Sequence, residues 1–104
     1  MFDIKLTSGL WIRVEGYPVT IRGFEKYQFF VHHSVTTSTP ISEDHWNVSE
    51  LLSGCAVTEK AYRTDLEAIQ GATETLHASK AWQVMLRLDK AIAQSSGDHW
   101  YWQP

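Results

Sequence analysis

A change of hydrophobic period near residue 62 sets the main limit on how this chain folds. Before that point, apolar and polar residues alternate along short segments, which is the period of β-strands with one buried face. After it, apolar residues recur at every third or fourth position, as in an amphipathic α-helix. Strands that come first and helices that come second favour an antiparallel sheet covered on one face by helices. The sequence therefore predicts an α+β fold.

Turn signals divide the strand region, residues 2–60, into about five to six short strands. Ser8–Gly9 and Ser53–Gly54 are expected tight turns, because glycine adopts positive φ without steric cost. Residues 36–45 have no period and contain hydroxyl, proline and acidic residues, so we expect an exposed loop there. The expected strands cover residues 2–7, 10–15, 19–21, 27–35, 46–52 and 55–60.

The helical region begins with a capping box formed by Thr64 and Glu67. The Thr64 hydroxyl can accept from a free backbone N–H, and the Glu67 carboxylate can reach back to the Thr64 N–H. This arrangement predicts a helix over about residues 64–77. Its buried stripe is expected to contain Leu66, Ile69, Ala72 and Leu76.

A second apolar stripe is rotated by roughly 120° from the first, at about 100° per residue. It predicts either two helices, over about 64–77 and 80–94 with Ser79 as the second N-cap, or one bent helix. The second stripe consists of Ala81, Met85, Leu88 and Ile92, with Val84 alongside.

Length and composition point to a single domain over residues 1–104. Hydrophobic residues make up 43% of the chain and charged residues 20%, which favours a globular fold over disorder. There is one cysteine, Cys55, and hence no internal disulfide. We expect no signal peptide and no membrane span, and so a cytoplasmic location. The net charge of −3 argues against broad nucleic-acid binding driven by phosphate neutralisation.

No catalytic constellation is visible in the sequence. His32 and His33 are neighbours in an expected strand, so their side chains point to opposite faces and cannot share a metal ion. Cys55 has none of the local signatures of thiol enzymes. The glycines do not form a phosphate-binding loop. We therefore expect a protein that is not an enzyme, with no catalytic residue, no metal site and no cofactor.

The five tryptophans are the unusual feature of the composition. Trp11, Arg13, Phe30 and His32 are expected to share the sheet face turned away from the helices. There they could anchor a protein partner or stack unpaired bases, or they could be covered by the tail or the second helix.

The tail, residues 95–104, contains the three consecutive aromatics Trp100, Tyr101 and Trp102. Disordered tails contain few large aromatic residues. We therefore expect these three to fold back over the sheet or to dock on a second copy or another protein.

Three segments of the chain resemble a pattern found in small bacteriophage and prophage accessory proteins. They are Trp46–Ser49, Ser53–Val57 and Thr64–Ile69, in which a strand, a glycine turn and a second strand lead to a capped helix. The resemblance covers about a third of the chain. It implies a small phage or bacterial protein that acts by binding, and it carries over no catalytic residue.

The predicted function is that of a small non-enzymatic protein-binding module, such as a phage-encoded inhibitor or adaptor, whose partner is another protein or a second copy of itself. The alternative is a single-stranded nucleic-acid-binding protein that uses an open sheet face. The candidate interface residues are Trp11, Arg13, Phe30, His32, Trp100, Tyr101 and Trp102.

Overall fold

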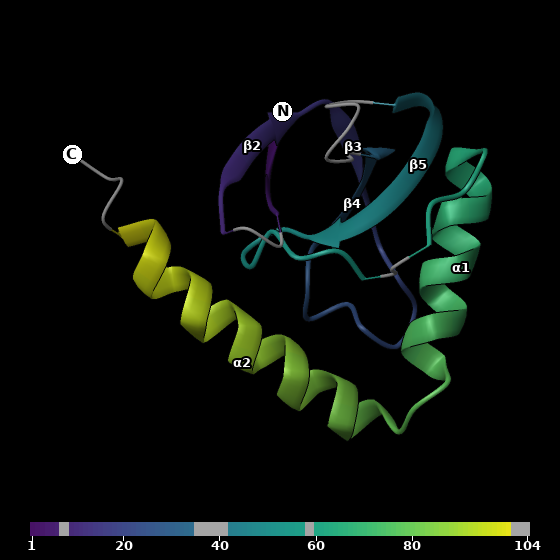
Figure 1. The fold of residues 1–104 in the computed structure, drawn as a ribbon. Helices are drawn as coiled ribbons and strands as arrows, with labels where there is room; N and C mark the ends of the chain where they lie inside the picture. The colour runs from purple at the N-terminus through teal and green to yellow at the C-terminus, as the bar shows by residue number, and fades with distance from the viewer. Residues whose placement is uncertain (7–8, 35–41, 58–59, 101–104) are drawn as a thin grey trace.

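The computed structural model describes residues 1–6, 9–34, 42–57 and 60–100, with side chains for all of these except 42–44 and 95–100. The described residues form an α+β fold, as predicted (Figure 1). Its elements in chain order are β1 (Phe2–Lys5), β2 (Trp11–Val14), β3 (Gly16–Val19), β4 (Phe29–Ser34), β5 (Ser42–Glu50), α1 (Asp65–His77) and α2 (Ala81–Trp100).

The strands form two antiparallel sheets, so the prediction of one sheet with five to six strands was wrong. β1 and β2 form a hairpin of their own, and β3, β4 and β5 form a three-stranded sheet in that order. Only Glu15 separates β2 from β3, so one nearly continuous extended segment pairs first with β1 and then with β4.

Gly16 lies where this extended segment passes from one sheet to the other. A Cβ atom at Gly16 would lie 2.2 Å from the Val31 carbonyl oxygen and 3.1 Å from the His32 Cβ. A glycine therefore allows the backbone of β3 to approach β4 closely, and the chain changes sheets at this residue.

Both helices contribute to one core on one face of the three-stranded sheet. Phe29 and Val31 of β4 and Val48 of β5 belong to the same buried cluster as Ala68 of α1 and Val84 of α2. The predicted placement of the helices on one sheet face is therefore confirmed for the three-stranded sheet. The pattern of alternating side chains along β4 brings about this arrangement, because every second residue points to the helices.

The opposite face of β4 is covered by the hairpin of β1 and β2. Phe30 packs with Ile4 and Val14 in a second buried cluster, and the Phe2 ring stacks on the Phe30 ring with centroids 4.4 Å apart. The expectation that this sheet face is open was therefore wrong. The described part of the molecule has three layers, with helices, sheet and hairpin in that order.

Several predicted boundaries also differ from the structure. The third strand is Gly16–Val19 instead of 19–21, and the fourth is Phe29–Ser34 instead of 27–35. The expected return strand at 55–60 is reduced to an isolated bridge between Ala56 and Ser49, with residues 58 and 59 outside the described residues. β5 includes the last four residues of the expected loop 36–45, and residues 36–41 lie outside the described residues.

Two separate helices are present, with the break at residues 78–80. The second extends to Trp100, so the predicted helix end at residue 94 and the tail beginning at residue 95 were wrong. The first half of the predicted capping box is confirmed: the Thr64 hydroxyl accepts from the Glu67 N–H at 3.1 Å. Leu66 was wrongly assigned to the buried stripe, because it lies about 160° around the helix from the buried Ala68 and is exposed. Within the described residues, neither helix is long and apolar enough to cross a bilayer.

Candidate functional site

Phe30 and His32 are buried, so they are not surface residues as predicted. The hairpin covers Phe30, and the His32 ring lies beside the Phe30 ring with centroids 5.2 Å apart. The His32 Nδ1 lies 2.7 Å from the His33 carbonyl oxygen, and its Nε2 lies 2.8 Å from the Ser49 hydroxyl. Burial lowers the pKa of His32, which keeps the imidazole neutral. His32 is therefore a hydrogen-bonded core residue.

The sequence did contain a signal for this burial. Phe29, Phe30 and Val31 are three consecutive apolar residues, and a strand that is buried on both faces has such a run in place of strict alternation.

Trp11 and Arg13 lie together on the outer face of the hairpin, and the hairpin itself separates them from Phe30 and His32. The Trp11 ring is half-buried, with the Lys5 Nζ 6.0 Å from its centroid. It fills the space beside Gly54, where a Cβ would lie 2.4 Å from the Trp11 Cζ3. Arg13 is exposed, and its Nε donates to the Asp3 Oδ1 at 3.3 Å. Trp11 is therefore occupied by contacts with Lys5 and with the turn at Gly54, and Arg13 by its contact with Asp3.

The three aromatics of the tail lie outside what the structure describes: the side chain of Trp100, and the whole of Tyr101 and Trp102.

The best-defined candidate surface is the side of α2 turned away from the core. Trp82 and Leu86 lie one turn apart there, 59% and 61% exposed. The opposite side of α2 packs on the core through Val84, Met85, Leu88 and Ile92. This helix thus has apolar residues on two sides, and only one of them is covered by the rest of the described chain.

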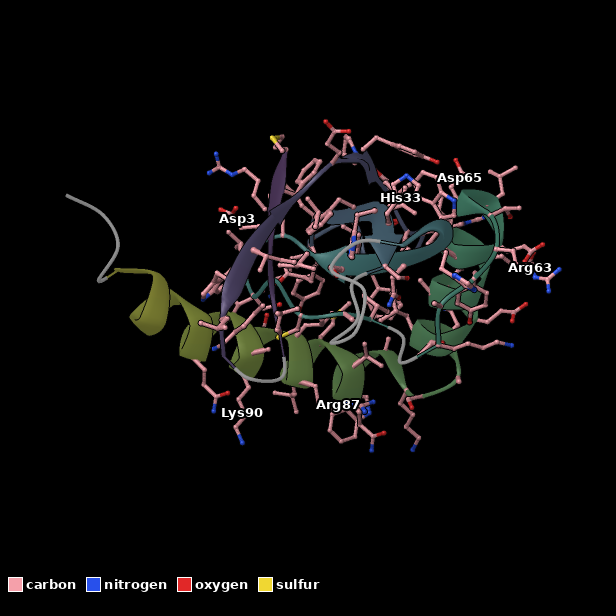
Figure 2. The ribbon with its side chains drawn as sticks, turned by 45° about the horizontal axis from the view of Figure 1, so that its top comes forward. Asp3, His33, Arg63, Asp65, Arg87 and Lys90 are labelled. Carbon is pink, nitrogen blue, oxygen red and sulfur yellow. The ribbon has the colours of Figure 1, made fainter. Side chains whose placement is uncertain are left out.

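Two cations extend from the same side of the helix. Arg87 and Lys90 point away from the sheets (Figure 2), and neither forms an ion pair with a described residue. We call the group of Trp82, Leu86, Arg87 and Lys90 the α2 outer face.

An acid within α2 does not neutralise this face, because it is bound elsewhere. The Asp89 carboxylate accepts from the Tyr27 hydroxyl at 2.8 Å and lies 3.5 Å from the Lys26 Nζ. Asp89 thereby fastens α2 to the turn before β4. Arg87 and Lys90 remain as unneutralised positive charges beside two exposed apolar side chains.

Trp82 and Leu86 were missed as site residues by the sequence reasoning. The signal was present: the stripe of Met85, Leu88 and Ile92 excludes both residues, with Trp82 about 60° around the helix from Met85 and Leu86 farther from the stripe. Large apolar residues on both sides of one helix indicate two covering surfaces, of which the chain itself supplies one.

A pocket of about 350 Å³ lies near Phe2, Val19, Glu25 and Leu51. Its two ionisable groups are bound within the protein: the Glu25 carboxylate accepts from the Gly23 N–H at 2.9 Å, and the Tyr27 hydroxyl donates to Asp89. Among the residues that the structure describes, no three His, Cys, Asp or Glu side chains are grouped to hold a metal ion. The pocket therefore offers weaker chemistry for a ligand than the α2 outer face.

Exposed apolar side chains beside free cations are suited to contact with a macromolecule, since rings and aliphatic groups supply buried area and charges supply orientation. Comparison with known proteins adds no second indication of function. No family model, no curated protein and no solved structure matches this chain.

Proposed function

We propose that this chain is a small non-enzymatic protein-binding module that contacts its partner through the α2 outer face. The observation that carries the proposal is the exposure of Trp82 and Leu86 on a helix whose other side lies in the core. Covering a large apolar side chain stabilises a complex by roughly 1.5–3 kcal/mol. Tryptophan and arginine are also the residues that most often dominate binding energy at protein interfaces.

The alternative, single-stranded nucleic-acid binding, was based on an open sheet face. Phe30, which the hairpin covers, and His32 are both buried, so they offer no stacking surface for bases. No other described feature favours that function over protein binding. An origin in a phage or prophage and a cytoplasmic location both stay predictions.

The proposal is tested by replacing the two apolar anchors with a polar residue of small size. The double variant Trp82→Ser/Leu86→Ser should lose the proteins that the wild-type chain retains in a quantitative pull-down from its native host. Because both side chains are exposed, circular dichroism and the melting temperature should stay close to those of the wild type.

The matched control is Leu10→Ser/Leu52→Ser. These leucines are 66% and 57% exposed and lie outside α2. The control should retain the same proteins as the wild type. If the α2 variant also retains them, the α2 outer face is not the binding surface and the proposal fails.

A further inference from the structure

The exposed side of α1 is an acidic counterpart of the α2 outer face. Leu66, Gln70 and Glu74 follow one another at intervals of four residues, with Glu67 beside them. Leu66 is 74% exposed, and the Gln70 Nε2 donates to the Glu74 Oε1 at 3.3 Å. Glu67 and Glu74 form no ion pair with a described residue. We call these four residues, Leu66, Glu67, Gln70 and Glu74, the α1 outer face.

The two outer faces have matching chemistry and opposite charge. The α1 outer face combines one exposed large apolar side chain, Leu66, with two carboxylates. The α2 outer face combines two, Trp82 and Leu86, with a guanidinium and an ammonium. They cannot meet within one chain, because Ala68 and Val84, on the opposite sides of the helices, lie in the same core. The helices also diverge from their junction at residues 78–80 (Figure 1).

We propose that the partner of the α2 outer face is a second copy of this chain, which presents its α1 outer face. This inference rests on the proposed function and names the partner. Leu66 of one copy packs against Trp82 and Leu86 of the other, and the carboxylates of α1 face Arg87 and Lys90. The contact joins two different surfaces, so each bound copy still offers one free face of each kind, and association continues beyond two copies or closes into a ring.

The distribution of charge along the chain supports this partner. Residues 1–78 contain ten acidic and six basic residues, whereas residues 79–104 contain two acidic and three basic ones. An unrelated acidic protein or an anionic membrane would be attracted to the same cations. Neither would require the exposed Leu66 and its two acidic neighbours on α1. A second copy accounts for both faces at once.

Two charge-reversal variants test the proposal by sedimentation velocity over a range of protein concentrations. The wild type should associate in the micromolar range, and more weakly when salt is raised from about 50 mM to about 500 mM, because exposed charges are screened. Arg87→Glu/Lys90→Glu makes both faces acidic, and Glu67→Lys/Glu74→Lys makes both basic. Each variant alone should associate at least tenfold more weakly than the wild type.

An equimolar mixture of the two variants should associate again, because each acidic face then meets a basic one. The control Arg13→Glu/Arg22→Glu changes the net charge as much as Arg87→Glu/Lys90→Glu does, and should behave as the wild type. Circular dichroism and melting temperature should show that every variant is folded. A mixture that stays monomeric would overturn the proposal.

A wild type that sediments as a monomer at all concentrations also overturns the inference. If such a monomer binds phosphatidylserine vesicles, the occupant is a membrane. If it retains host proteins that Trp82→Ser/Leu86→Ser loses, the proposed function stands without self-association. If the wild type associates and Trp82→Ser/Leu86→Ser associates equally well, the apolar anchors have no part in the contact and both proposals fail.

Discussion

At the scale of single residues, the Tyr62 ring explains why position 71, inside α1, is a glycine. An alanine inside a helix is ordinarily about 1 kcal/mol more favourable than a glycine. A Cβ at Gly71 would lie 2.2 Å from the Tyr62 hydroxyl oxygen and 2.3 Å from its Cζ. We therefore expect Gly71→Ala to lower the free energy of unfolding by about 1–3 kcal/mol, in urea denaturation.

The Tyr62→Ala background provides the control for this prediction. With the ring removed, the contact with the new methyl group is gone, and Gly71→Ala should become neutral or stabilising. If Gly71→Ala has the same effect in both backgrounds, the Tyr62 ring does not explain the glycine.

At the scale of elements, the contact between Tyr27 and Asp89 fastens α2 to the core. The Tyr27 side chain is buried, and its hydroxyl donates to the Asp89 Oδ1 at 2.8 Å. Burial, together with this hydrogen bond to a carboxylate, raises the pKa of Tyr27 to about 12. The protonated form is thus favoured in the folded state over the unfolded state, where the pKa is near 10.

This difference makes stability depend on pH in the alkaline range. The contribution is fully present below about pH 10, and it is lost as the pH rises from about 10 to about 12. Tyr27→Phe should therefore flatten the fall of the unfolding free energy over that range. The Tyr17 hydroxyl donates to Asp65, and its pKa is also raised to about 12, so part of the fall should remain. An unchanged slope in Tyr27→Phe would contradict the prediction.

The elements also show how far the sequence alone could lead. The helix start at Thr64 and the hairpin of β1 and β2 depend on residues close together in sequence, and both were predictable. The division into two sheets depends on the close approach of the Gly16 backbone to the Val31 carbonyl oxygen, and these two residues are 15 positions apart in the sequence. Local periodicity contains no information about such a contact. For the same reason the α2 outer face could be defined only once the core side of the helix was known.

At the scale of the whole molecule, aromatic residues serve two different purposes. Phe30 lies between the three-stranded sheet and the hairpin with no exposed surface, in contact with Phe2, Ile4 and Val14. Trp82 lies on the opposite, outer side of the helical layer and is 59% exposed. The first ring holds two layers together, whereas the second leaves more than half of its surface exposed.

Truncation of each ring should therefore separate folding from binding. Phe30→Ala should lower the free energy of unfolding by about 3–5 kcal/mol, because it leaves a cavity between two layers. Trp82→Ala should change it by less than about 0.5 kcal/mol, since little contact is lost. Urea denaturation followed by circular dichroism measures both. If Trp82→Ala destabilises the monomer as strongly as Phe30→Ala does, then the indole belongs to the core and the α2 outer face is not available for a partner.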